Sequence, residues 1–114
     1  MKTLLDAHHE QIAELPWGFL PPKFQPGLQN YMRDGVPPGD FLQAVLEDRL
    51  FEAMGRADDE SVHMLKGLCT WIYSYAPSMA WGSPEKCARW SAELAEARRN
   101  PTPLIEGDKA QTEA

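Results

Sequence analysis

Residues 36–61 read VPPGDFLQAVLEDRLFEAMGRADDES, and residues 77–90 read PSMAWGSPEKCARW. The segment Pro37-Pro38-Gly39-Asp40, the acids at 58–60 and the triplet Ser83-Pro84-Glu85 are typical helix starts. Between these starts, apolar residues recur at intervals of three and four positions, which is the period of a helix face. The two segments therefore predict helices over 39–55, 59–76 and 84–99, which together form the core of the fold.

Two more helices are predicted on the N-terminal side. Residues 1–15 suit a short helix, and a second one runs from about Pro22 or Lys23 to Asp34, where Gly35 ends it as a left-handed cap. Pro26 is tolerated only in the first turn of a helix, which places the true start near Gln25. Three prolines and a glycine in the segment LPWGFLPP, residues 15–22, exclude a continuous helix there. The segments contain neither strand-like alternation nor an internal repeat.

We therefore expect an all-α fold, a helical bundle of four to five helices in a single compact domain. This domain covers residues 1–100, with its core within 22–99, and residues 101–114 are predicted to form a disordered C-terminal tail. Ser83 is the expected N-cap of the last helix, and Trp81 is expected to anchor the turn before it. The predicted core residues are Leu46, Leu50, Leu65, Cys69, Ile72, Trp90 and Leu94.

The net charge of −6 is concentrated in one part of the chain. Residues 37–60 hold seven acids against Arg49 and Arg56, whereas residues 61–100 hold five bases and three acids. An acidic surface repels nucleic-acid phosphates and attracts basic partners. The acids therefore indicate either a solvated helix face or a patch that recognises a partner.

No set of residues with recognisable catalytic chemistry is found. His8 and His9 are adjacent, so on a helix they point in different directions and do not chelate one ion. Cys69 and Cys87 fall on predicted apolar faces, where buried thiols act as small hydrophobes. We expect no enzymatic activity, no metal and no cofactor.

The sequence also predicts where the protein resides. The N-terminal residues do not resemble a signal peptide, because Asp6, His8, His9 and Glu10 follow Leu5 at once. No apolar run approaches the ~18 residues that a membrane span requires. We expect a cytoplasmic protein with reduced thiols and no membrane contact.

Two segments, GVPPGDFLQAVLEDRLFEAMGRADDES and WGSPEKCARW, resemble a family of small accessory proteins encoded in bacteriophages and prophages. The resemblance covers about residues 22–91. It brings no catalytic or binding residues with it, since none is established for that family. It implies a protein of a bacterial host cell's cytoplasm that binds a host component, including defence complexes such as CRISPR effectors.

The expected function is that of a non-enzymatic phage accessory protein that binds and inhibits a host protein or protein complex. The expected partner-binding residues combine acids with aromatic residues of the proline-rich loop: Glu47, Asp48, Glu52, Trp17 and Phe19. The alternative is a nucleic-acid-binding factor for phage replication or gene expression. Its binding residues would be the bases of the last helix: Lys86, Arg89, Arg98 and Arg99.

Overall fold

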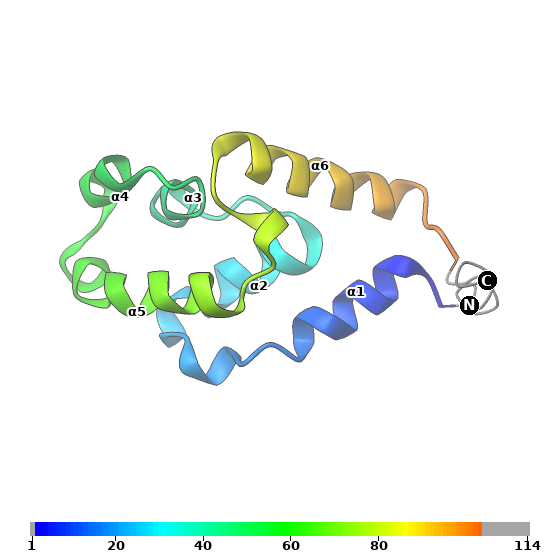
Figure 1. The fold of residues 1–114 in the computed structure, drawn as a ribbon, viewed down its shortest axis with the longest axis horizontal. Coiled ribbons are helices and arrows are strands. Elements are labelled where there is room, and N and C mark those ends of the chain that lie inside the picture. Colours follow the sequence, from blue (N-terminus) through cyan, green and yellow to red (C-terminus); the bar gives the residue numbers. More distant parts are fainter. Residues whose placement is uncertain (1, 104–114) are drawn as a thin grey trace.

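The computed structural model describes residues 2–103 and confirms the all-α fold (Figure 1). The α-helices are α1 (Leu4–Ala13), α2 (Gln25–Asp34), α3 (Asp40–Leu46), α4 (Leu50–Arg56), α5 (Asp59–Tyr75) and α6 (Pro84–Arg99). Short 3-10 helices lie between them: η1 (Trp17–Phe19), η2 (Pro22–Phe24) and η3 (Ser78–Ala80). Six α-helices replace the predicted four to five because residues 39–55 form two helices.

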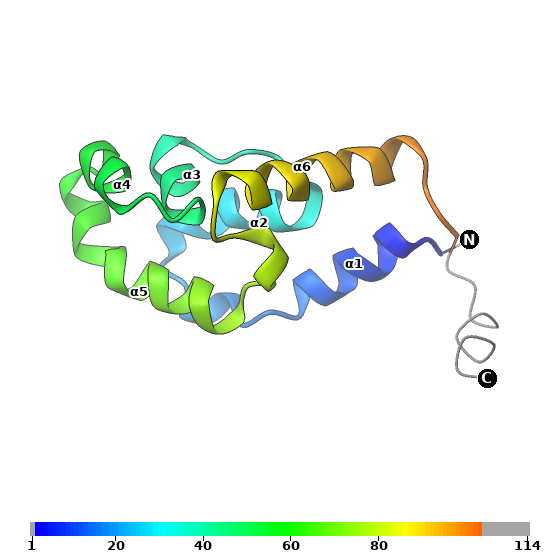
Figure 2. The same cartoon turned by 45° about the horizontal axis from the view of Figure 1, so that its top comes forward.

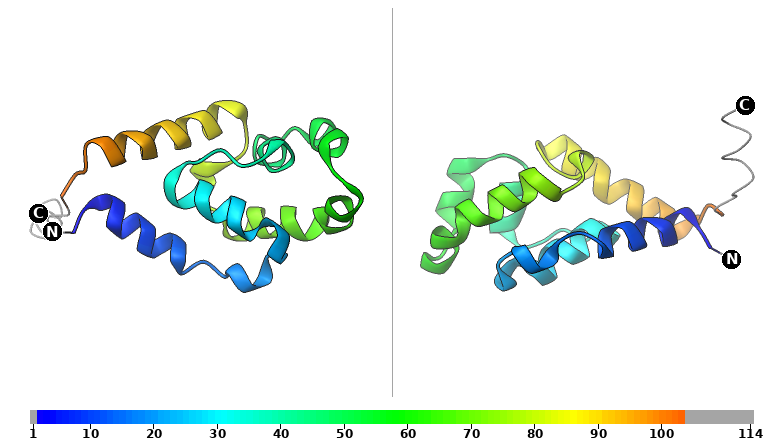
Figure 3. Two further views of the ribbon diagram at one scale, coloured as in Figure 1. Left: turned by 180° about the vertical axis from the view of Figure 1, so that it is seen from behind. Right: turned by 60° about the horizontal axis from the view of Figure 1, so that its bottom comes forward.

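The helices are arranged along one long axis. α3, α4 and α5 form one end of the molecule, whereas α1 and α6 extend toward the other (Figures 1 and 2). Seen from behind, α2 occupies the middle and joins the two ends (Figure 3). The domain is thus elongated, with principal extents of 52 × 26 × 24 Å.

Side chains fix the starts of α5 and α6, as the sequence predicts. Ser83 Oγ accepts a hydrogen bond of 3.1 Å from the Lys86 amide, and Asp58 caps α5 by accepting from the Ser61 amide at 2.7 Å. The Lys23 ammonium and this amide lower the pKa of Asp58 to about 2. The cap carboxylate is therefore ionised through the physiological range and stabilises the positive end of the helix dipole.

Buried and half-buried aromatic residues join α2 and the loop before it to the later part of the chain. Tyr31 is fully buried, and its hydroxyl donates to the Ala80 carbonyl at 2.6 Å. The indole of Trp90 donates to the Tyr31 carbonyl at 3.0 Å, and that of Trp71 donates to the Pro16 carbonyl at 2.9 Å. Because polar groups inside a protein are costly when unpaired, these bonds fix how the helices meet.

Gly35 ends α2 in the left-handed conformation predicted for it, with φ at 75°. A Cβ atom at this position would lie 2.9 Å from the Ser91 Cα atom of α6. Glycine is therefore required twice, once for the backbone angle and once for the close approach of α6.

The prediction of one continuous helix over 39–55 is wrong. After Leu46 the chain turns at Asp48, whose φ is 62°. The Arg49 amide donates to the Ala44 carbonyl at 2.9 Å, and the Asp48 amide donates to the Val45 carbonyl at 3.1 Å. This pair of bonds is the Schellman motif, which ends a helix at a left-handed residue. Aspartate is one of the few non-glycine residues that tolerate this conformation.

Two residues of the predicted core are therefore on the surface. Leu50, after the turn, is 57% exposed, and Cys69 on α5 is also exposed. Leu46 and Ile72 are buried as predicted, while Leu65 packs against the core without being fully buried. Leu50 is exposed because α4 leaves α3 in a new direction. On α5, the buried face carries Leu68, Trp71 and Ile72, and Cys69 lies outside it. Leu94 is buried and Trp90 is partly buried.

The predicted disordered tail lies mostly outside the described residues, which end at 103. Residues 101–103, which belong to it, instead pair with the start of α1. The Leu4 amide donates to the Thr102 carbonyl at 2.8 Å, and Thr3 and Pro103 form an isolated antiparallel bridge. The described part of the predicted tail is thus ordered by a backbone contact.

We predict that Leu46→Ala destabilises the protein by about 2–5 kcal/mol, because it leaves a cavity in a fully buried site. Leu50→Ala removes a mostly exposed side chain and is expected to cost less than about 1 kcal/mol. Urea unfolding followed by circular dichroism measures both values. Equal costs at the two positions would contradict the observed break between α3 and α4.

A second prediction concerns the turn at Asp48. Asp48→Gly should leave stability unchanged or raise it by up to about 1 kcal/mol, because glycine adopts positive φ without strain. Asp48→Val should destabilise by about 1–2 kcal/mol, since a β-branched residue is disfavoured there. Thermal unfolding of the two variants checks this order, which would be reversed if α3 and α4 formed one continuous helix.

Candidate partner-binding surface

Helix α4 carries three large apolar side chains that face solvent. Phe51 is 91% exposed, and its neighbours Leu50 and Met54 are also exposed. On a helix, residues three and four positions apart are neighbours, so the side chains of Leu50, Phe51 and Met54 form one continuous patch. Only Ala53 of this helix is buried. A short helix that buries one alanine leaves most of its apolar surface available for contact.

Helix α5 carries a second exposed apolar row. Val62, Cys69 and Tyr73 are all exposed, with Tyr73 at 79%. Because they are seven and four residues apart, they project from the same side of the helix. The inner face of α5, with Leu68, Trp71 and Ile72, is buried.

Helices α4 and α5 lie at the same end of the molecule (Figure 1). The charge of Asp48, in the α3–α4 turn, acts on Cys69, and Leu50 follows that turn directly. The Gly82 amide donates to the Leu46 carbonyl at 2.8 Å, which holds the segment after α5 against the end of α3. We name the six exposed residues the α4–α5 apolar surface: Leu50, Phe51, Met54, Val62, Cys69 and Tyr73.

Two of the three predicted partner-binding acids are engaged within the protein. Glu47 accepts from Gln43 Nε2 at 2.8 Å and pairs with Arg49 at 3.2 Å, and only 14% of its side chain is exposed. Glu52 pairs with Arg49 at 3.7 Å and with Arg56 at 3.0 Å. Together with Asp40, these residues line a small polar depression of about 180 Å³ between α3 and α4. These acids hold α4 against α3.

Asp48, the third acid, is exposed, and its carboxylate makes no hydrogen bond or ion pair with the residues that the structure describes. Asp59, in the first turn of α5, is exposed and likewise has no such bond there. Asp58 and Glu60 share Lys23, at 2.9 and 3.0 Å. The region from 40 to 60 thus keeps an excess of negative charge after its internal ion pairs are formed.

Trp17 and Phe19, the predicted aromatic anchors, occupy different environments. Trp17 packs on Trp71 with ring centroids 4.7 Å apart, and its indole donates to the Ile12 carbonyl at 2.8 Å. It therefore belongs largely to the fold, because the proline-rich loop folds back on α5. Phe19 is 76% exposed and stacks on Tyr75, beside a groove of about 380 Å³. Phe19 lies on η1, whereas the three predicted acids lie in the α3–α4 turn and on α4.

The four bases predicted for nucleic-acid binding differ in their contacts and in their exposure. Arg98 donates to the Asp34 carbonyl, and Arg99 pairs with Glu96 at 2.6 Å. Lys86 is half-buried at the start of α6, and Arg89 is exposed without a hydrogen bond or ion pair to the described residues. A stripe of free positive charge along α6 is therefore not formed by these residues.

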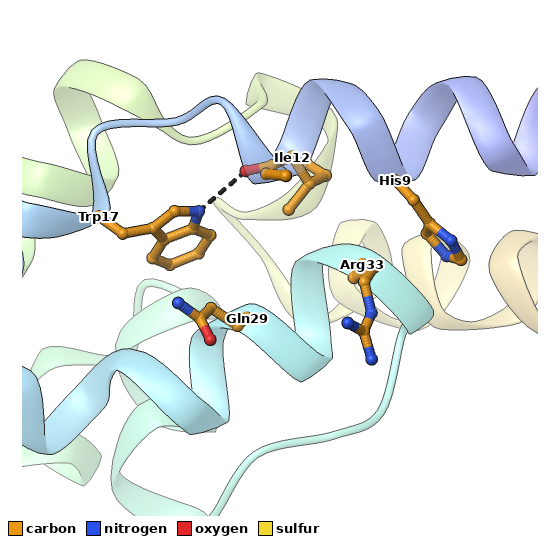
Figure 4. Close-up of a pocket in the computed structure, with 6 residues that line it drawn as sticks. His9, Ile12, Trp17, Gln29 and Arg33 are labelled. Atoms are coloured by element: carbon orange, nitrogen blue, oxygen red, sulfur yellow. Dashed lines mark hydrogen bonds between the residues drawn. The ribbon is translucent and has the colours of Figure 1, made fainter.

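A pocket of about 240 Å³ lies between α1 and α2 (Figure 4). His9 and Arg33 line one end, and Trp17 and Gln29 line the other. His9 Nε2 lies 3.0 Å from Asp34 Oδ1, and Arg33 Nε donates to Asp34 Oδ2 at 3.1 Å. Burial opposes ionisation of Asp34, but these two partners outweigh it and lower its pKa. The contact between His9 of α1 and Asp34 of α2 therefore joins the two helices beside this pocket.

The cysteines have the environment of neutral thiols. Partial desolvation, and then the charge of Asp48, raise the pKa of Cys69, and burial raises that of Cys87. A raised pKa lowers the fraction of thiolate, which is the nucleophilic form. Within residues 2–103 the structure assembles no group of three or more His, Cys, Asp or Glu side chains suited to a metal ion.

The sequence pattern does not predict the α4–α5 apolar surface. Leu50, Met54, Val62 and Cys69 follow the helical period, so the pattern assigns them to the core. The pattern does not reveal what covers an apolar face. Asp48 is the one local signal, because it interrupts the stripe with a residue that accepts positive φ.

The chain matches no family model, no curated protein and no solved structure. Among the helices that the structure describes, none is both long and apolar enough to cross a membrane.

The two cysteines should differ sharply in reactivity. A thiol reagent such as DTNB is expected to modify Cys69 in the native protein and to reach Cys87 only after unfolding, since Cys87 is buried. The Cys69 reaction should accelerate as the pH rises past the ordinary thiol range, because its pKa is raised. Mass spectrometry of the labelled peptides identifies the site. Labelling of Cys87 first would show that α5 and α6 are placed wrongly.

Proposed function

We propose that this protein is a non-enzymatic accessory protein of the bacteriophage type that binds and inhibits a host protein or protein complex. The observation that carries the proposal is the exposed Phe51 on α4, flanked by Leu50 and Met54. Burying such side chains in an interface contributes about 1.5–3 kcal/mol each. Aromatic residues surrounded by apolar neighbours are frequent centres of binding energy.

The charge around this surface supports a protein partner over a nucleic acid. Asp48 and Asp59 leave unpaired carboxylates in the same region, and these repel phosphates. On α6, Arg98 and Arg99 are engaged with groups of the protein itself. Arg89 is the exposed base that carries the alternative of nucleic-acid binding.

The resemblance of residues 22–91 to phage-encoded proteins supports a bacterial host target in the cytoplasm. A defence complex, such as a CRISPR effector, is the target class that this resemblance favours. The exposed apolar surface supports an inhibitor that works by occupying a surface of its target. Such an inhibitor needs no catalytic group.

Capture from a bacterial lysate, followed by quantitative mass spectrometry, tests the proposal. We expect at least one host protein to bind the wild type and to fall by roughly tenfold or more with Phe51→Asp, because a buried carboxylate replaces an aromatic anchor. Val36→Asp is the matched control, since Val36 is an exposed apolar residue on the α2–α3 connection. Phe19→Asp tests the contribution of η1 separately.

Once the target is identified, the wild-type protein should bind the purified target in a titration and reduce its activity. A gel-shift series with short single- and double-stranded oligonucleotides at two salt concentrations provides the opposite test. Tight, salt-sensitive shifts that disappear with Arg89→Ala would overturn the proposal in favour of nucleic-acid binding.

A further inference from the structure

We propose that the groove between η1 and α5 binds an extended segment of a partner protein that contains proline and an acidic residue. We name it the η1–α5 groove, and six residues line it: Phe19, Lys66, Gly67, Thr70, Trp71 and Tyr75. The inference rests on the proposed function, because it describes a contact with the host protein. The groove does not include Phe51 of α4, so the two surfaces can be tested separately.

Gly67 is a residue that the fold itself does not require. It lies in the middle of α5, where glycine is less favourable than alanine. Its φ is not positive, and the nearest atom that a Cβ would meet beyond its own part of the helix is Pro21 Cγ, at an ordinary 4.0 Å. Because Gly67 lines the groove, a larger side chain would occupy part of it. Glycine therefore keeps the groove open to a ligand that comes close to α5.

The loop before α2 shows how α5 holds an extended segment in this region. The Trp71 indole N–H donates to the Pro16 carbonyl at 2.9 Å. Leu20 and Pro21 have φ and ψ of −90° and 136° and of −52° and 132°, close to the polyproline II conformation, and Pro21 lies beside Gly67. A polyproline II segment has no internal hydrogen bonds, so its carbonyls need donors from a neighbour. Helix α5 already supplies such a donor to its own chain.

The groove offers a second segment the same kinds of contact. Phe19 and Tyr75 present exposed aromatic rings, and the buried Trp71 also lines the groove. Aromatic side chains that line a groove are the surfaces on which proline-rich segments dock. The Thr70 hydroxyl is exposed and has no hydrogen-bond partner among residues 2–103, so it can donate to a peptide carbonyl.

Lys66 determines the charge of the expected ligand, because it is the one charged residue among those that line the groove. It is exposed and makes no hydrogen bond or ion pair with the described part of the chain. An acidic side chain beside the prolines would pair with this ammonium and fix the orientation of the peptide. A single base is little for a nucleic acid, whose binding depends on several phosphate contacts, and the net charge of −6 opposes it.

The chain's own extended proline segments are engaged elsewhere, which favours a different protein over a second copy. In the segment 36–39, Pro38 is half-buried and lies beside Gly27 of α2. Residues 101–103 pair with the start of α1 through their backbone. Either segment would have to leave these contacts before it could enter the groove of another copy.

A model peptide tests the inference without the natural partner. The probe is a fluorescein-labelled peptide of about nine residues that repeats Pro-Pro-Glu, since polyproline II has about three residues per turn and places the glutamates on one edge. Peptides that repeat Pro-Pro-Lys or Gly-Ser-Glu are the comparison probes, because they lack the acid or the prolines. In fluorescence anisotropy we expect the Pro-Pro-Glu peptide to bind roughly tenfold more tightly than either one.

Charge reversal tests the role of Lys66. Lys66→Glu should weaken binding of the Pro-Pro-Glu peptide and strengthen binding of the Pro-Pro-Lys peptide, so the ratio of the two affinities should change by roughly tenfold or more. Phe19→Ala should weaken both peptides, because it removes an aromatic side of the groove. Both residues are exposed, and circular dichroism checks that the variants are folded.

Gly67→Leu separates a binding role from a structural one. It should reduce peptide binding by roughly tenfold or more, while the midpoint of thermal unfolding stays the same or rises, because leucine favours the helix. Gly55→Leu is the matched control: Gly55 is an exposed glycine of α4, where a Cβ would meet no atom within 4 Å. This control should leave peptide binding unchanged.

Several results would overturn the inference. Three peptides that bind equally, or not at all, would remove the proline segment, and so would wild-type affinity in Gly67→Leu. A single-stranded oligo(dT) that binds more tightly than the Pro-Pro-Glu peptide, and is lost with Phe19→Ala, would assign the groove to nucleic acid. A dimer in analytical ultracentrifugation that Lys66→Glu dissociates would assign it to a second copy.

The outcomes for the groove and for the proposed function can be told apart. Failure of the peptide, while lysate capture still depends on Phe51, rejects the proline segment and leaves the proposed function standing. Peptide binding that depends on Lys66 and Gly67, without any Phe51-dependent capture, supports the groove and rejects the proposed function.

Discussion

The left-handed turn at Asp48 is the constraint on which the functional end of the molecule depends. Its Schellman hydrogen bonds end α3 just after the buried Leu46. The chain must then leave in a new direction, so α4 buries only Ala53 and displays Phe51. Without this turn, Leu50 and Met54 would continue the buried stripe, and the chain would have a larger core and a smaller exposed apolar surface.

Local signals in the sequence were sufficient for most of the architecture. Ser83 caps α6 as expected, Asp58 caps α5 as one of the acids expected at its start, and Gly35 ends α2, because each of these residues acts through bonds to nearby backbone groups. The start of α6 at Pro84 and the end of α5 at Tyr75 follow from the same short-range rules. Such features do not require knowledge of the distant parts of the chain.

Long-range packing could not be predicted in the same way. Periodicity shows that Cys69 and Ile72 share the apolar side of α5, but it does not tell which of them meets another element of this chain. Trp17 is partly buried because Trp71, far along the chain, lies 4.7 Å from it, centroid to centroid. The candidate site was missed for this reason: its residues look like core until their neighbours are known.

The backbone pairing of Thr3 with Pro103 has a consequence for how the domain can be joined to other proteins. Both flanks of the described chain meet at the end of the long axis opposite α4 and α5 (Figure 2). A fusion at either flank therefore points away from Phe51. The domain can therefore be attached to another protein through this end without covering α4. Because residues 3 and 103 are adjacent, a circular permutant that links them by a short glycine linker should keep the fold.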